Sequence, residues 1–236
     1  MSSCSPDTLA AARRLRDAGR ADAALACYDK ALSITPDAGL YFEVAALAHA
    51  HGRMATLESS LRASVRLVPS FGDGHFELGN VLHGQSRFAE AAASFKAALD
   101  QAELGDRGMV LNNLANALTE LGDEQGAETA YARGLQLVPR GTTAAFLLNG
   151  LANQQSARGG DAEAVGTIQR ALRVQPQAHY AAFNLGNFLR RLKRWPEAER
   201  SYRSALAAEP TDPRYHQGVG TVLHERGRPH EAVALP

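Results

Sequence analysis

The chain has 236 residues, of which 45% are hydrophobic, and it carries 25 basic and 25 acidic side chains. Its formal net charge of zero gives no overall attraction to nucleic acid or to an anionic membrane. No run of about 18 uncharged apolar residues occurs, so no membrane-spanning helix is expected. Two cysteines are too few for a disulfide scaffold of this size, which favours a reducing, cytoplasmic location.

Small turn residues and prolines recur along the chain with a period of about 34 residues. Ser86 and Lys193 take the turn position in two units, and the other five turns hold Gly19, Gly52, Gly122, Gly159 and Gly227. Five units close with a proline 17 residues after the turn, namely Pro36, Pro69, Pro139, Pro176 and Pro210. The predicted units span residues 5–37, 38–71, 72–107, 108–144, 145–178, 179–212 and a partial 213–236.

Each unit is predicted to form two helices, one on each side of its turn. The segments "LGNVLHGQSRFAEAAASFKAAL" and "LGNFLRRLKRWPEAERSYRSAL" show the pattern most clearly. The first helix carries a small residue between two leucines at helical spacing, as at Gly79. The second carries alanine and then, four residues later, a ring or an aliphatic side chain, as at Ala127 and Tyr131. The small residues allow two helices to approach closely.

These residues resemble those of the tetratricopeptide repeat family along essentially the whole chain. The second unit matches least well, because Leu57, Leu61 and Ser64 stand where Ala, Tyr and Ala are usual. The resemblance implies an all-α fold in which antiparallel helix pairs stack into a right-handed superhelical solenoid. It implies six complete helix pairs plus a partial seventh, in a single solenoid over residues 5–236, with the first helices lining a concave groove.

The seventh unit stops at Pro236, before its second helix is complete. An uncapped repeat would expose the apolar face that a following repeat normally covers. Two alternatives follow: the chain is a fragment of a longer protein, or its C-terminal face docks on a partner, such as another copy. In the second case, changing Val219 or Leu223 to Glu is expected to abolish concentration-dependent association.

No catalytic constellation is found in the sequence. His224 and His230 are separated by a turn and cannot share a helix face, and no Gly-x-Ser-x-Gly or phosphate-binding loop occurs. Cys27 is expected to pack inside a second helix. The basic run from Arg190 to Arg194 suits a helix C-terminus and a solvated turn, so nucleic-acid binding is not expected. We therefore expect neither enzymatic activity nor a bound metal or cofactor.

The family resemblance places positions two, five, nine and twelve of each first helix on the groove. The ninth position holds Asn80, Asn116, Asn153 and Asn187 in four successive units. Asn112 and Asn149 lie one turn earlier, and Asn184 lies beside them. Asparagine is a mediocre helix former, so its recurrence calls for an explanation. Either these amides bond to adjacent helices, or they form a ladder that holds the backbone of an extended peptide.

Such a ladder cannot account for tight binding by itself. Four amide contacts at about 0.5–1.5 kcal/mol each fall short of the roughly 8 kcal/mol of micromolar affinity. Side-chain pockets at the fifth position, formed by Phe42, Phe76 and Phe183, are predicted to supply the rest. Changing the four ninth-position asparagines to alanine is expected to weaken peptide binding at least about tenfold, with little change in melting temperature.

Two subfamilies are compared on these positions. The carboxylate-clamp cochaperones carry a lysine at the fifth position, and this chain has none there, so that mode of binding is not expected. The segments "NNLANALTELGD" and "LGNVL" are similar to the repeats of O-GlcNAc transferases, whose asparagine ladder holds protein substrates, although no catalytic domain is present. The predicted function is a non-catalytic scaffold that binds an extended peptide or protein. The alternatives are the substrate-recognition arm of a larger glycosyltransferase and a self-assembly module.

Overall fold

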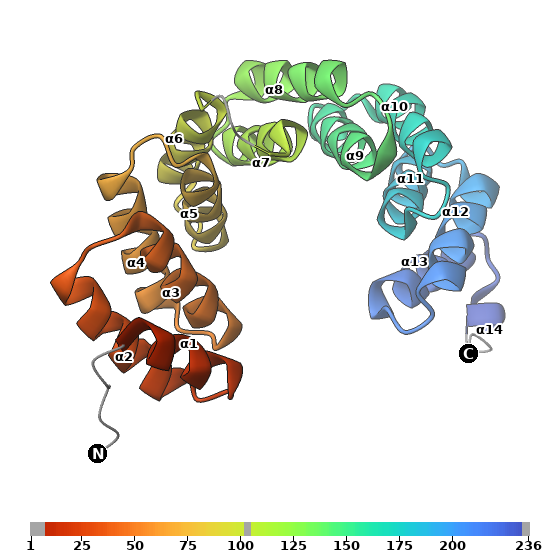
Figure 1. The fold of residues 1–236 in the computed structure, drawn as a ribbon. Coiled ribbons are helices and arrows are strands. Elements are labelled where there is room, and N and C mark those ends of the chain that lie inside the picture. Colours follow the sequence, from red (N-terminus) through yellow and green to blue (C-terminus); the bar gives the residue numbers. More distant parts are fainter. Residues whose placement is uncertain (1–7, 102–104, 233–236) are drawn as a thin grey trace. The chain divides into compact units, whose positions relative to one another are not determined.

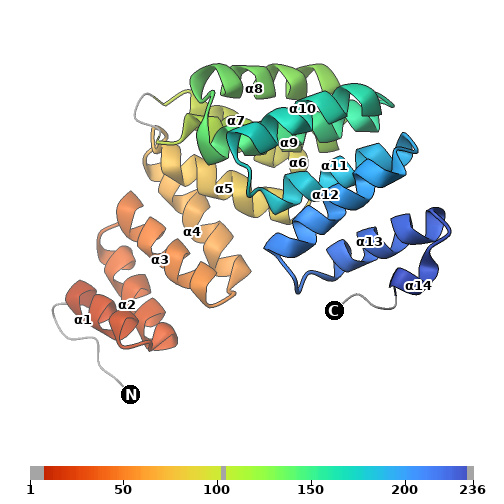
Figure 2. The same ribbon diagram turned by 90° about the vertical axis from the view of Figure 1, so that its right-hand side faces the viewer.

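The computed structural model describes residues 8–101 and 105–232, which contain fourteen helices and no strand (Figures 1 and 2). The chain divides into an N-terminal unit, Met1–Gly105, and a C-terminal unit, Asp106–Pro236. The N-terminal unit holds α1 (Thr8–Asp17), α2 (Ala21–Ile34), α3 (Ala38–Ala50), α4 (Met54–Leu67), α5 (Gly72–Gly84) and α6 (Phe88–Leu99). The C-terminal unit holds α7 (Arg107–Glu120), α8 (Glu124–Leu137), α9 (Gly141–Ala157), α10 (Asp161–Val174), α11 (His179–Arg191), α12 (Trp195–Ala208), α13 (Pro213–Glu225) and α14 (Pro229–Ala232).

The helices of each unit pair in chain order, as the repeat pattern predicts. Each odd-numbered helix packs on the even-numbered helix that follows it, and each pair packs on the next pair within its unit. In the C-terminal unit, α9 also packs on α7 and α11, and α11 packs on α13. The odd-numbered helices of the C-terminal unit therefore share one face, which we call its first-helix face (Figure 1). The predicted all-α fold class is confirmed, whereas one continuous solenoid over residues 5–236 stays a prediction.

The seven turn residues anticipated from the repeat all adopt positive φ angles. The five glycines have φ between 67° and 85°, while Ser86 and Lys193 both have φ of 59°. A side chain in this left-handed region costs about 1–2 kcal/mol, which glycine avoids. Two repeats therefore complete the same turn at an energetic cost.

Replacing Lys193 by glycine is expected to raise the free energy of unfolding of the C-terminal unit by about 0.5–1 kcal/mol, because the relieved strain exceeds glycine's extra chain entropy. Denaturant unfolding measures this change. The matched control is Gly122→Ala, at φ of 77° with no neighbouring atom within 4 Å of the added Cβ, which should lower stability through backbone strain alone. A destabilised Lys193→Gly variant would contradict the argument.

The helix ends follow local sequence signals. In five units, the predicted closing proline lies two residues beyond the last residue of the second helix. Proline has no backbone N–H, and at this position the helix needs none. Asp37, Asp106 and Asp212 cap the first helices α3, α7 and α13 by accepting backbone N–H bonds of 2.7–3.0 Å. Helix α9 begins at Gly141, four residues before the predicted unit start, and accommodates the longer spacing in that region.

In five repeats, a ring or aliphatic side chain from the second helix fills the space between first helices. Tyr131 and Tyr202 are each 1% exposed. The other members of this set are 0% exposed, namely Tyr28, Phe95 and Ile168. Close approach depends on glycine: a Cβ at Gly186 or Gly218 would lie 2.6–2.7 Å from the Tyr202 ring. The predicted role of the small residues is thereby explained, because the ring occupies the place of the missing side chain.

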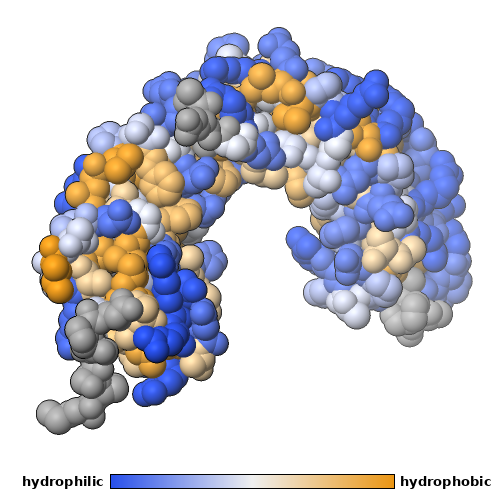
Figure 3. Space-filling model, viewed as in Figure 1, coloured by the Kyte–Doolittle hydropathy of each residue, from blue (hydrophilic) through white to orange (hydrophobic). Residues whose placement is uncertain are grey.

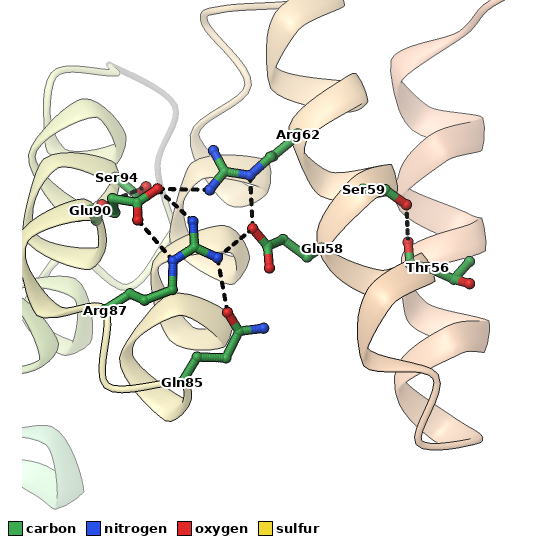
Figure 4. A network of polar contacts seen from close by, with 8 residues as sticks. All are labelled: Thr56, Glu58, Ser59, Arg62, Gln85, Arg87, Glu90 and Ser94. Atoms are coloured by element: carbon green, nitrogen blue, oxygen red, sulfur yellow. Dashed lines mark hydrogen bonds and ion pairs between the residues drawn. The ribbon is translucent and has the colours of Figure 1, made fainter.

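A polar network joins two successive helix pairs of the N-terminal unit (Figure 4). Arg87, at the start of α6, donates to Glu58 of α4 at 2.7 Å and to Glu90 of α6 at 2.6 Å. Arg62 of α4 donates to both carboxylates at 2.8–2.9 Å. The Arg87 and Arg62 guanidiniums lower the pKa of Glu90 to about 2 and also hold the pKa of Glu58 below its ordinary value. The network links α4 to α6 through four ion pairs.

Apolar side chains are also exposed in both units. Ile34, Leu67 and Leu137 are the last residues of α2, α4 and α8, with 46–77% of each residue exposed. Figure 3 shows apolar surface over α4 and its neighbours, and again over α8. By contrast, Val219 and Leu223, the positions expected to mediate self-association, are 0% exposed and belong to the core formed by α9 to α13. A Glu at either position would disrupt the core, so those substitutions cannot test self-assembly.

Candidate functional site

The first-helix face of the C-terminal unit holds six of the seven asparagines predicted to bind peptide. Two of the ninth-position residues are held by tyrosines of their own helix pairs: the Tyr131 hydroxyl donates to Asn116 Oδ1 at 2.6 Å, and the Tyr202 hydroxyl donates to Asn187 Oδ1 at 2.8 Å. Burial raises the pKa of Tyr131 to about 12 and raises that of Tyr202, so both hydroxyls remain protonated donors. In these two amides the acceptor oxygen is engaged and the NH₂ group remains as the donor.

The remaining members of the predicted ladder differ from these two. Asn153 is exposed and, within the described ranges, makes no side-chain hydrogen bond, because the facing residue of α10 is Ile168 and carries no hydroxyl. Asn80 belongs to the N-terminal unit and donates to Glu77 Oε2 at 3.4 Å. The four ninth-position residues therefore do not form one uniform set.

The asparagines one turn earlier bond mainly to each other. Asn184 of α11 donates to Asn149 Oδ1 of α9 at 2.8 Å, which links two adjacent first helices. Asn112 is 8% exposed and donates to Asn113 Oδ1 at 3.1 Å. These residues fit the structural explanation for the asparagines, since their amides bond within the fold.

The three predicted phenylalanines are all partly buried. Phe183 packs against the rings of Tyr202 and Tyr215, with centroid separations of 5.5 and 5.1 Å. Phe42 meets Phe71 edge-on at 5.1 Å, and Phe76 lies 6.1 Å from the Phe95 ring. Each ring packs against at least one aromatic neighbour and keeps some accessible surface, as a contact residue requires.

A small pocket of about 190 Å³ brings part of the predicted set together on α11 and α13. Phe183 and Asn187 line it, with Arg190, Arg214 and Gln217 around them. Arg190 pairs with Glu225 at 3.2 Å, and Arg214 pairs with Asp212 at 2.6 Å. The pocket presents N–H donors beside an aromatic wall, a combination suited to peptide carbonyl or carboxylate oxygens.

Sequence reasoning did not single out two aromatic residues on this face. Phe146 of α9 and Tyr180 of α11 stack with centroids 5.0 Å apart and an interplanar angle of 15°. Both hold position two of their first helices, and their spacing of 34 residues equals the repeat, so the groove positions themselves contained the signal. The Tyr180 hydroxyl is buried and, among the residues that the structure describes, has no hydrogen-bond partner.

The other candidate chemistries gain no support. The arginines of the basic run pair with carboxylates: Arg191 with Asp161 at 3.3 Å and Arg194 with Glu197 at 2.7 Å. Cys27 is buried in α2, as predicted, and carries no free thiol, so the cysteines no longer favour a reducing location. Within residues 8–101 and 105–232, no group of three metal-ligating side chains converges, and no helix is both long and apolar enough to cross a bilayer.

Solved structures of similar fold were found by comparison. PilW, a widely conserved type IV pilus biogenesis factor, matches with a TM-score of 0.71 at 18% identity over 94% of this chain and 100% of its own. YrrB, described as a TPR protein with an unusual peptide-binding site, gives 0.59 at 18% identity over 85% and 97%. A chain of the APC/C hetero-tetramer Cut9–Hcn1 gives a TM-score of 0.67 at 17% identity. That match covers 95% of the present chain but only 45% of the Cut9–Hcn1 chain. At these identities the likeness shows the fold alone.

The family itself is shown by sequence models. No curated protein matches this chain. One model described as a tetratricopeptide repeat matches residues 55–106, 76–142, 149–213 and 189–235, and a second matches residues 12–38. Together these matches cover most of the sequence and follow the repeats seen in the structure. The chain belongs to the tetratricopeptide repeat family.

Proposed function

We propose that this tetratricopeptide protein is a non-catalytic scaffold that binds an extended segment of a partner protein on the first-helix face of its C-terminal unit. The observation that carries the proposal is the pair of Tyr–Asn contacts. Because each tyrosine hydroxyl engages the Oδ1 atom, the amide NH₂ groups of Asn116 and Asn187 remain as oriented donors for backbone carbonyls of a bound chain. Asn153 lies between them in the repeat order and is exposed.

Apolar contacts would add the affinity that amide bonds do not supply. Phe183 and the Phe146–Tyr180 stack lie on the same helices as the asparagines. Aromatic side chains bury a large area at low entropic cost and dominate many binding surfaces. The fold is compatible with this role, since YrrB, of similar fold, is described as having a peptide-binding site.

The test is binding of peptides selected from a random dodecamer phage-display library. Asn116→Ala, Asn153→Ala and Asn187→Ala combined should weaken the selected peptides about tenfold, equivalent to about 1.4 kcal/mol. Two of these changes also remove a tyrosine contact, so some stability will be lost, unlike the expectation from sequence. Fluorescence anisotropy measures affinity, and circular dichroism measures the folded fraction.

Asn116→Asp with Asn187→Asp is the matched control for stability. Aspartate keeps an acceptor for each tyrosine but lacks the NH₂ donors, so the fold should be retained while peptide affinity falls. Unchanged affinity in this variant, or selected peptides that contact only residues outside the first-helix face, would refute the donor role.

The finer alternatives from the sequence remain predictions. The similarity of "NNLANALTELGD" to O-GlcNAc transferase repeats suggests the first alternative, in which the same face recognises substrates. The peptides that bind there would then be substrates of an attached catalytic domain. Self-association would need a surface other than Val219 and Leu223, which are buried.

A further inference from the structure

An apolar hollow of about 350 Å³ opens among α3, α4 and α5 of the N-terminal unit. Its floor consists of Ala45, Leu57 and Leu61, which are 1–3% exposed. Phe42 and Ala46 of α3 form a wall, and two polar side chains, His49 of α3 and Glu77 of α5, lie at the edge. An apolar cavity of about 150 Å³ already accommodates a benzene ring, so this hollow is large enough for one leucine, methionine or phenylalanine side chain.

The hollow arises where this repeat departs from its neighbours. Leu61 stands at the position held by Phe95, Tyr131 and Tyr202 in other repeats, whose rings fill the space between first helices. Ala46 stands at the ninth position, where four other repeats carry asparagine. In the pair α7–α8 a tyrosine reaches across to that asparagine.

Neither half of that contact exists in the pair α3–α4. The leucine is shorter than tyrosine, and the alanine offers neither bulk nor an amide to meet it. Because Leu61 replaces a ring and Leu57 replaces the usual alanine, the floor of the hollow is aliphatic instead of aromatic. Two departures that meet at one place thus leave an open, apolar space instead of a filled one.

Glu77 gives this space a negative edge. The corresponding carboxylate one repeat earlier, Glu43, is neutralised by Arg13 at 2.5 Å and by Arg16 at 3.2 Å. Glu77 is partly buried, accepts the Asn80 amide at 3.4 Å, and forms no ion pair within the part of the chain that the structure describes. An apolar group that covered Glu77 by itself would leave the carboxylate buried and unpaired. A basic group next to the apolar group would form an ion pair with Glu77.

We propose that this hollow, the α3–α5 socket, receives one large apolar side chain of a partner segment that carries lysine or arginine next to it. The inference rests on the proposed binding function and extends it to the N-terminal unit, naming the ligand class. The aliphatic floor selects the apolar side chain, and Glu77 selects the basic neighbour.

The test uses capped tripeptides and methyl NMR of the full chain labelled at leucine. Acetyl-Lys-Leu-Lys-amide should produce saturable shifts of the Leu57 and Leu61 methyl resonances, and acetyl-Glu-Leu-Glu-amide should need a concentration about tenfold higher. Glu77→Gln keeps an acceptor for Asn80 and should remove most of this difference. Equal responses to the two peptides in the native chain would overturn the charge selection.

A filling variant tests the socket itself. Ala46→Asn with Leu61→Tyr restores the pattern of neighbouring repeats and should abolish the response to the lysine peptide, followed at the Leu57 methyls, without lowering the melting temperature. Undiminished binding in the double variant, if it is folded, would overturn the proposal, as would Leu57 and Leu61 methyl resonances that do not shift in the native chain. If those resonances do not shift while selected dodecamers still bind the C-terminal unit, the proposed function stands and only the socket proposal fails.

Discussion

Replacing Tyr202 by alanine is expected to lower the free energy of unfolding of the C-terminal unit by about 3–5 kcal/mol, the usual cost of removing a large buried ring. Tyr202 is 1% exposed and lies against Gly186 of its own pair and Gly218 of the next. Its loss would open a cavity that neither glycine can fill. Chemical denaturation followed by circular dichroism measures the effect.

Tyr202→Phe is the control that separates packing from hydrogen bonding. It keeps the ring and removes the hydroxyl, which bonds to Asn187 and also contacts Arg190, so a loss of about 0.5–1.5 kcal/mol is expected. Equal losses in the alanine and phenylalanine variants would show that the hydroxyl, rather than the ring, stabilises this interface.

Replacing Gly186 by alanine should destabilise the same unit by about 1–3 kcal/mol, the cost of overpacking a well-filled core. The new Cβ would lie 2.6 Å from the Tyr202 ring, so the ring or the helix α11 must move. The loss arises although alanine is intrinsically the better helix former. Denaturant unfolding with an unchanged m-value would show that stability, and not the extent of unfolding, has changed.

Gly166→Ala provides the opposite result in the same unit. Gly166 lies inside α10, is exposed, and has no neighbouring atom within 4 Å of an added Cβ. Helix propensity then acts alone, and stability should rise by about 0.5–1 kcal/mol. If both glycine substitutions were stabilising, close packing of Gly186 on Tyr202 would not be required.

The sequence predicted the repeat fold well because its signals are local. Positive φ at Ser86 and Lys193 follows from their alignment with turn glycines, and helix ends follow from prolines that cannot continue a helix. The start of α9 was missed by four residues, since its extra turn carries no proline or strong capping side chain.

The candidate site was less predictable. Repetition identified the asparagine positions, but it could not show which atoms of each amide are engaged. That depends on the residue 15 positions later, which is tyrosine opposite Asn116 and Asn187 but isoleucine opposite Asn153. The Phe146–Tyr180 stack likewise joins residues 34 apart, whose contact requires adjacent helices to be packed.

The sequence by itself determined the helix pairs, their turns and the residues buried between them, because 3.6-residue periodicity and turn chemistry act over a few residues. Only the tertiary structure decided that tyrosine hydroxyls engage the amide oxygens of Asn116 and Asn187, and that Ala46 and Leu61 line an open hollow beside Glu77. Those properties depend on distances between side chains of different helices, which packing fixes and repetition alone does not specify.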